Sequence, residues 1–168
     1  MNPAPADSFV SLTEVHAELF AGFAAHQVAL LRRDFDGARA KLATFRARLE
    51  RHIDAEEELF QSVYAHTGDV TRNDGVMGRA PIDLFTSEHR HFRAQMATFE
   101  LLAARLDAKD PQVDARLLDL LEEEATFKAF FRHHDERERN LLYPSLDDHV
   151  PAERRPELLR RFRERTKE

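Results

Sequence analysis

Two histidine–glutamate pairs have the spacing at which one face of a helix presents both side chains to the same metal ion. They are His52 with Glu56 and His134 with Glu138, each pair four residues apart. Residues at i and i+4 are neighbours on a helix surface, so an imidazole nitrogen and a carboxylate oxygen can reach one ion. Two such helices that face each other can hold two ions. The pairs therefore predict metal chemistry on histidine and glutamate ligands.

Two further histidines interrupt rows of apolar residues at helical spacing. On the first expected helix we assign Leu12, Val15, Leu19, Phe23, His26 and Leu30 to the inward face. On the third, His89 stands between Phe85 and Phe92. A buried imidazole or carboxylate costs several kcal/mol unless it is paired or bound to a metal. A shared metal site explains all the inward polar residues at once, and the predicted ligands are His26, His52, Glu56, His89, His134 and Glu138.

The elements that position these residues are predicted to be helices. Core positions recur in steps of three and four over residues 11–33, 36–66, 82–107 and 111–142, and a short fifth helix is expected at about 156–167. No stretch alternates apolar and polar residues as a strand does. We therefore expect one all-α domain over 1–168, an up-down-up-down four-helix bundle at about 11–146 with a short C-terminal helix. Residues 67–80 are predicted to form the longest loop.

Composition excludes several classes of protein. The 168 residues contain no cysteine, which excludes disulfides, thiolate zinc sites and the usual iron–sulfur ligands. The formal charge of −6 creates no field that attracts nucleic acid. No apolar run approaches the roughly 18 residues of a membrane span, and the N-terminal MNPAPADS does not resemble a signal peptide. We expect a cytoplasmic protein with no nucleic-acid or membrane partner.

The heights of the predicted ligands along the helices provide a check. His26 lies about nine or ten residues before the expected turn between Asp34 and Gly37 and His52 about sixteen after it, a mismatch of roughly 10 Å at about 1.5 Å per residue. For His89 and His134 the mismatch is roughly 8 Å. The spacing around each helix supports the site more strongly than the height does.

Other titratable residues are assigned mainly to the surface. His16 does not fall on the apolar row, and the remaining histidines outside the site are also expected at the surface: His66, His91, His133 and His149. Glu88 is an alternative metal ligand. His133 is an alternative hydrogen-bond donor to one of the ligands. Glu124 is expected to pair with Lys128, because it lies about 15 Å along the helix from His134.

Four imidazoles and two carboxylates suit a divalent transition metal better than magnesium or calcium. Iron is favoured, and manganese or zinc less so. Ferritin-like di-iron bundles are the nearest competing class, but they need two Glu-x-x-His motifs, and here Glu88 and His91 alone have that spacing.

The pattern resembles the hemerythrin-like domains, also called HHE cation-binding domains. The likeness spans about 11–146 and includes the sequences HIDAEEELF from His52 and HDERERNLLYP from His134, together with His26 and the pair Glu88–His89. It implies a non-haem centre of two iron ions bridged by the two carboxylates, either with or without an additional oxo bridge. It also implies that the six predicted ligands bind the irons and that the partner is dioxygen, nitric oxide or peroxide.

One departure from the family concerns the third helix. Oxygen-carrying hemerythrins have two histidines four apart there, whereas His89 has Phe85 and Arg93 at those positions. The centre would keep more open positions, which favours reaction or sensing over oxygen storage. We expect a sensor or a protein of oxidative or nitrosative defence. The alternatives are an iron-handling protein and a peroxidase or oxidase, so whether the protein is an enzyme stays open.

Overall fold

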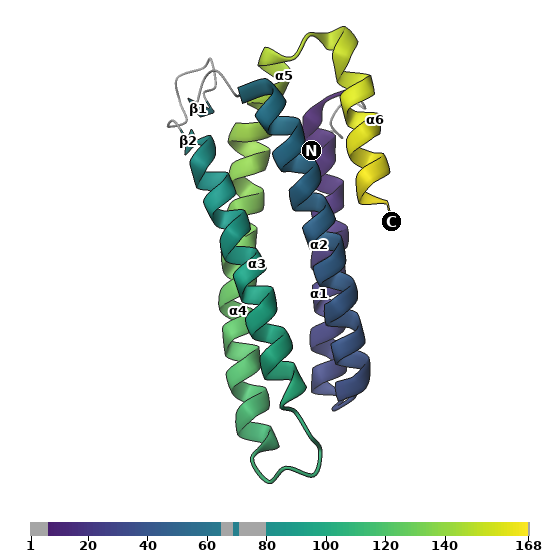
Figure 1. Cartoon of the computed structure of the whole chain (residues 1–168), viewed down its shortest axis with the longest axis vertical. Coiled ribbons are helices and arrows are strands. Elements are labelled where there is room, and N and C mark those ends of the chain that lie inside the picture. The colour runs from purple at the N-terminus through teal and green to yellow at the C-terminus, as the bar shows by residue number, and fades with distance from the viewer. Residues whose placement is uncertain (1–6, 65–68, 71–79, 168) are drawn as a thin grey trace.

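Four long helices lie side by side along the molecule. The computed structural model describes residues 7–64, 69–70 and 80–167. The long helices are α1 (Thr13–Leu31), α2 (Phe35–Tyr64), α3 (Ile82–Ala104) and α4 (Val113–Arg137). Successive helices run in opposite directions, and α2 packs on α1 and α3 while α4 packs on α3 and α1 (Figure 1). The expected helical chain is confirmed, with element bounds within a few residues of those predicted.

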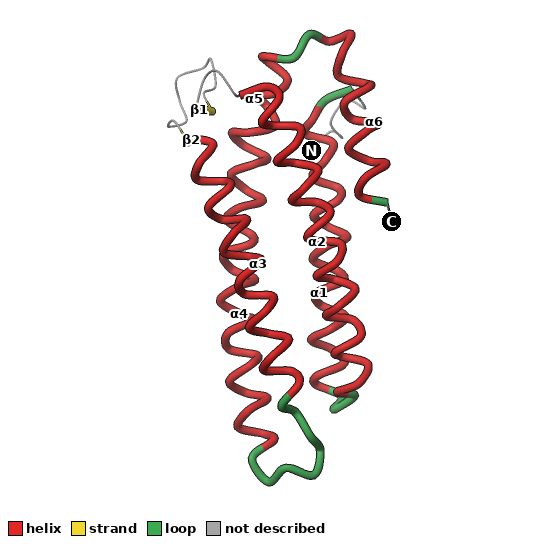
Figure 2. Tube along the Cα trace, viewed as in Figure 1, coloured by secondary structure: helices red, strands yellow, loops and turns green. Residues whose placement is uncertain are grey.

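Shorter elements close the end of the molecule that holds the chain termini. They are a 3-10 turn at Phe9–Leu12, a π-helical turn at Glu138–Leu142, α5 (Tyr143–His149), a 3-10 turn at Ala152–Arg154 and α6 (Arg155–Thr166). The helix expected near the C-terminus is α6, whereas α5 was not predicted as a separate helix. Figure 2 shows α4, the π turn and α5 as consecutive helical segments. The π turn ends where the Tyr143 N–H donates to the Glu138 carbonyl.

Two short strands join the ends of the connection between α2 and α3. β1 (Asp69–Val70) pairs antiparallel with β2 (Ala80–Pro81). No strand is predicted from the sequence at these positions. The rest of the predicted 67–80 loop lies outside the described residues.

The turn between α1 and α2 fixes the antiparallel arrangement of these helices. Arg33 has a φ of 58°, and the Asp34 N–H donates to the Ala29 carbonyl at 3.0 Å, which closes α1. The Asp34 carboxylate then accepts the Gly37 N–H at 3.0 Å and caps α2. A Cβ at Gly37 would overlap this carboxylate, so glycine permits the close approach. The short turn predicted near Asp34 is confirmed.

The apolar core is divided into two clusters. The larger one fills the space among the long helices and is rich in phenylalanine, including Phe23, Phe45, Phe92, Phe99, Phe127 and Phe131. The second lies under α5 and α6 and contains Phe9, Leu12, Leu59, Phe85, Tyr143 and Phe162. On each long helix, or between the helix and the turn that adjoins it, a buried polar residue separates a member of one cluster from a member of the other. A polar layer thus lies between two apolar ones.

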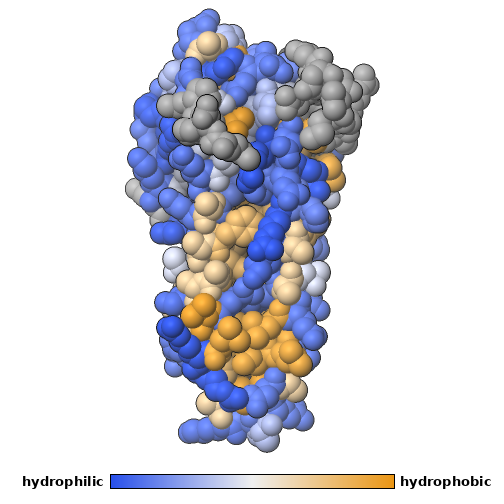
Figure 3. Space-filling view, turned by 180° about the vertical axis from the view of Figure 1, so that it is seen from behind, coloured by the Kyte–Doolittle hydropathy of each residue, from blue (hydrophilic) through white to orange (hydrophobic). Residues whose placement is uncertain are grey.

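On the face shown in Figure 3, the described surface at the upper end is mostly hydrophilic. Figure 3 shows an apolar area toward the opposite end. Exposed large apolar side chains include Val28 and Leu31 of α1 and Leu118 of α4. Among the described residues, no helix combines the length and the hydropathy required to cross a membrane.

Candidate metal centre

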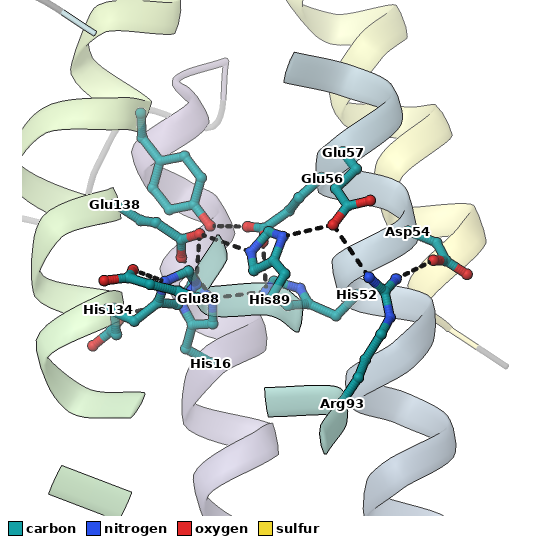
Figure 4. A network of polar contacts seen from close by, with 12 residues as sticks. His16, His52, Asp54, Glu56, Glu57, Glu88, His89, Arg93, His134 and Glu138 are labelled. Carbon is teal, nitrogen blue, oxygen red and sulfur yellow. Dashed lines mark hydrogen bonds and ion pairs between the residues drawn. The ribbon is translucent and has the colours of Figure 1, made fainter. Parts of the chain in front are cut away.

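The polar layer brings together six side chains from all four long helices. Each is at most 1% exposed. They form two overlapping groups: His16, His52, Glu56 and Glu138 make the first, and Glu56, His89, His134 and Glu138 the second. Within each group the potential ligand atoms all lie within 4.8 Å of one another. Figure 4 shows these side chains converging between the helices.

Local spacing explains why these residues point inward. On α2, His52 and Glu56 follow Leu49 and precede Leu59 in steps of three and four, the positions that stay on one face. The same steps place His16 between Leu12 and Leu19 on α1. They also place His89 between Phe85 and Phe92 on α3. His134 of α4 and Glu138 of the π turn likewise lie between Phe131 and Leu142.

Several inward atoms lack the hydrogen bonds that buried polar atoms normally make. Glu56 Oε2, His89 Nε2 and both carboxylate oxygens of Glu138 have no hydrogen-bond partner in the described part of the chain. Such orphaned atoms are rare in folded proteins because each one costs free energy. Here they face one another in one layer. A bound cation would satisfy them together, so this layer passes the chemical test for a metal site.

The distances between facing atoms also suit shared ions. In the first group His16 Nε2 lies 2.8 Å from His52 Nε2 and 3.1 Å from Glu138 Oε2. In the second, His134 Nε2 lies 2.9 Å from Glu138 Oε1, and His89 Nε2 lies 3.5 Å from Glu56 Oε2. Two donors at about 2.1 Å from one ion are separated by about 3.0 to 3.4 Å for right-angle to tetrahedral geometry. Each group has the dimensions of one coordination sphere.

Both carboxylates belong to both groups. Glu138 turns Oε2 toward His16 and Oε1 toward His134. Oε2 of Glu56 lies 3.2 Å from His52 Nε2 and faces His89 as well. Glu56 and Glu138 are therefore placed to bridge two ions.

Tyr143 holds the other oxygen of Glu56. Its hydroxyl donates a hydrogen bond to Glu56 Oε1 at 2.7 Å, and the phenol ring is stacked on His16 at a centroid distance of 6.2 Å. Tyr143 is 0% exposed. Burial and the charges of Glu138 and Glu56 raise the pKa of its hydroxyl well above the usual value, so the phenol remains a donor.

Three carboxylates outside this layer hold the far nitrogens of three imidazoles. His16 Nδ1 lies 2.8 Å from Asp135 Oδ1 and His134 Nδ1 lies 2.8 Å from Glu88 Oε2. His89 Nδ1 lies 3.1 Å from Glu57 Oε1. We call Glu57, Glu88 and Asp135 the outer carboxylates. Metal-binding histidines commonly donate their second N–H to such a group, which fixes the orientation of the ring.

Each outer carboxylate also pairs with an arginine closer to solvent. Asp135 accepts from Arg139 at 2.6 Å, Glu88 accepts from Arg137, and Glu57 accepts from Arg93 at 3.3 Å. These guanidinium groups offset the three outer negative charges, so when the imidazoles are neutral the two inner carboxylates are the uncompensated charge of the centre. The centre is consequently suited to binding cations.

Without a metal, the carboxylates favour protonated imidazoles in this layer. Burial lowers the pKa of His16, but contacts with Asp135 and Glu138 outweigh it and raise the pKa to about 10. Burial and Glu138 raise the pKa of Glu56, yet His52 and His89 bring it down to about 2. Burial dominates at His52 and lowers its pKa. Metal binding must therefore displace protons from imidazoles.

The structure brings five of the six predicted ligands together and places His26 elsewhere. His26 Nε2 lies 2.7 Å from Glu124 Oε1, and its Nδ1 lies 2.8 Å from the Ala38 carbonyl. Both side chains are 0% exposed. His26 belongs to neither group of potential ligands among the described residues. Glu124 was expected to pair with Lys128, which instead donates to Gln27.

His16 takes the place in the layer that was assigned to His26. It was expected at the surface, and that expectation was wrong, since it is 1% exposed. The signal was present, because His16 is four residues after Leu12 and three before Leu19. Val15 is more apolar and also fits a three-residue step from Leu12, but it is only partly buried.

Glu88 and His133, the alternative ligand and the alternative donor behind a ligand, both lie outside the two groups of potential ligands. Glu88 lies behind His134 as an outer carboxylate. His133 is 67% exposed and pairs with Glu136 at 3.5 Å, away from the centre. Phe85 and Arg93, which flank His89 where a second histidine was absent, contact His134 and Glu57 respectively.

Comparison with known family models, curated proteins and solved structures found no match to this chain.

Proposed function

We propose that this protein is a hemerythrin-like, non-haem di-iron protein with an up-down-up-down four-helix bundle. It binds or reacts with dioxygen, nitric oxide or peroxide, as a sensor or in defence against oxidative or nitrosative stress. The observation that carries the proposal is the pair of overlapping groups that share Glu56 and Glu138. The sequence likeness around His52 and His134 is the reason for naming this family.

The donor set favours iron and leaves room for a small ligand. Each group offers two imidazoles and two shared carboxylates. Sites with two histidines, carboxylate ligands and open positions are typical of non-haem iron that reacts with oxygen species. Bound iron would supply electrons and Lewis acidity to such a ligand.

The chain's own residues would orient the ions and keep the site dry. Outer carboxylates hold His16, His89 and His134 in fixed orientations. Tyr143 holds Glu56 and supplies a hydroxyl proton beside the two groups. The two apolar clusters above and below exclude water, which strengthens electrostatic interactions in the layer.

The test is metal analysis of protein from iron-supplemented cells, with visible spectra before and after reduction and exposure to air. About two irons per chain, with near-ultraviolet bands that change on reduction, are the expected result. The matched variants are His52→Ala and His133→Ala, because His133 is an exposed histidine beside a ligand. The first should lose iron and the second should retain it.

The choice between binding and turnover needs a separate assay. Steady consumption of peroxide with a reductant would identify an enzyme, and a spectral change without turnover would identify a sensor or binding protein. Wild-type protein with no stoichiometric metal would overturn the proposal.

A further inference from the structure

The contacts between outer carboxylates and imidazoles follow one direction around the four helices. Glu57 of α2 holds His89 of α3, Glu88 of α3 holds His134 of α4, and Asp135 of α4 holds His16 of α1. Each outer carboxylate is adjacent in sequence to one of the six side chains of the polar layer, which we now call the metal layer. These neighbours are Glu56, His89 and His134. A fourth contact, from α1 to His52 of α2, would complete the ring.

That fourth contact is missing. Glu88 directly precedes His89 on α3, and α1 runs in the same direction as α3, so the corresponding residue on α1 is Val15, directly before His16 (Figure 1). Valine has no group that accepts a hydrogen bond. His52 Nδ1 is buried without a hydrogen-bond partner among the described residues. His16 Nδ1 also lacks a hydrogen bond of regular geometry, but Asp135 Oδ1 lies 2.8 Å from it as an ion-pair partner, whereas no described carboxylate lies at ion-pair distance from His52 Nδ1. His52 is the one imidazole of the layer whose far nitrogen no carboxylate holds.

An aromatic side chain from α6 covers His52 instead. The rings of Phe162 and His52 meet edge to face at a centroid distance of 5.7 Å. Phe162 is 3% exposed, and on its other side it lines a surface groove between α2 and α6, together with Arg51 and Leu158. In Figure 4 the ribbon of α6 runs beside α2 on the side away from His134. Phe162 thus contacts the His52 ring and also lines this groove.

We infer that the two metal positions are unequal and that the divalent ion held by His16 and His52 is the exchangeable one, leaving past Phe162 on the α6 side. This inference rests on the proposed function. The position of His89 and His134 has both imidazoles anchored by carboxylates, whereas the position of His16 and His52 has one. Loss of a group behind a metal-binding histidine typically reduces metal affinity by about 10-fold to 100-fold. The exchangeable ion should therefore dissociate at least about tenfold faster.

The experiment follows transfer of ferrous iron from the loaded, anaerobic protein to a coloured iron chelator. Wild-type protein should release its iron in two phases of equal amplitude, at rates that differ about tenfold or more. Because the readout is iron release, it is independent of any activity with oxygen or peroxide.

Two substitutions act on the fast phase in opposite directions. Val15→Glu supplies the missing carboxylate beside His52 and should slow the fast phase toward the rate of the slow one. Phe162→Ala removes the cover and should accelerate the fast phase while the slow phase keeps its rate. Ala17→Glu is the control for Val15→Glu, because it adds the same charge at an exposed position next to His16 and should change neither phase.

A third substitution tests the other position. Glu88→Gln weakens the hold on His134, so it should accelerate the slow phase and leave the fast one. If a buried glutamate at position 15 prevents folding, Phe162→Ala and Glu88→Gln still assign the two phases to the two positions.

The outcomes separate this inference from the proposed function. Release of two irons in a single phase would overturn the inference alone, as would equal acceleration of both phases by Phe162→Ala. Protein that holds no iron would overturn the proposed function and this inference with it.

Discussion

His26 and Glu124 form a fully buried pair in a second polar layer, with Nε2 of the imidazole 2.7 Å from the carboxylate. His26 lies ten residues after His16 on α1, and Glu124 lies ten residues before His134 on α4. At about 1.5 Å per residue, this pair is about 15 Å from the metal layer along the helices. The pair joins α1 to α4, and the Ala38 carbonyl extends it to α2.

The two histidines of α1 should respond differently to substitution. His16→Ala should reduce bound iron from two ions per chain to one or none, because it removes a potential ligand. His26→Ala should retain two irons but lower the free energy of unfolding by about 3–5 kcal/mol, because Glu124 stays buried without the imidazole and keeps Gln27 Nε2 as its donor at 3.2 Å. Iron analysis and urea denaturation check both. Retention of two irons by His16→Ala would place the metal elsewhere.

Tyr143→Phe should preserve packing and alter the metal environment. The variant loses the hydrogen bond to Glu56 Oε1, and a hydrogen bond to a charged group contributes about 1.5–3 kcal/mol. We expect two bound irons with shifted near-ultraviolet bands and lower stability. Unchanged spectra together with unchanged stability would show that the hydroxyl does not act on Glu56.

Removal of the metal should destabilise the fold without abolishing it. Ligands that bind only the folded state at about a thousand times their Kd add about 4 kcal/mol. For a domain of this size that corresponds to roughly 8–16 °C in Tm. Thermal denaturation with and without a chelator measures the difference, and far-ultraviolet circular dichroism at 20 °C should show retained helix. Equal Tm values would indicate that the layer is stable without metal.

The metal-free protein should lose stability as pH rises from 7 to 10. His16 of α1 faces Asp135 of α4, Glu138 of the π turn, and His52 and Glu56 of α2. Its pKa in the folded state is about 10 against 6.5 ordinarily. A raised pKa contributes stability that is full below about 6.5 and is lost as pH passes through about 10. The pKa values of His89 and His134 are also raised, so their effects have the same sign.

The measurement is Tm against pH, with and without metal. Iron binds neutral imidazole, so the stabilisation by metal should grow over the same interval. A metal-free Tm that stays level or rises between pH 7 and 9 would contradict the assignment of protonated imidazoles.

Most of the site could be predicted from helical periodicity, and α1 shows where that reasoning failed. Each core position was chosen by apolarity, which favoured Val15 over His16. The height of each histidine along its helix distinguishes His16 from His26. His16 is fifteen residues before the end of α1 and His52 seventeen after the start of α2, a difference of about 3 Å, whereas His26 is five residues before that end. The mismatch of roughly 10 Å found for His26 was therefore a sign of the wrong residue.

The outer carboxylates were beyond the reach of periodicity for a physical reason. Glu57, Glu88 and Asp135 lie beside the inward face, on the flank where neighbouring helices meet, and charged residues there usually face water. Their partners are on other helices, at sequence separations of 32, 46 and 119 residues. Only the packing of the helices shows which imidazole each one meets. The π turn was equally invisible, because its residues also fit an α-helix.

The π turn at Glu138–Leu142 makes the site sensitive to chain length at one point. It adds one residue to a helical turn between the shared carboxylate of Glu138 and the phenol of Tyr143. Deletion of a single residue here would restore α-helical hydrogen bonding and, at about 100° per residue, rotate α5 relative to α4. The helix would become more regular, while the phenol would leave Glu56. A variant of this protein with the native length here keeps the Tyr143 hydroxyl beside Glu56. A variant one residue shorter would have a continuous α-helix and no phenol at the metal site.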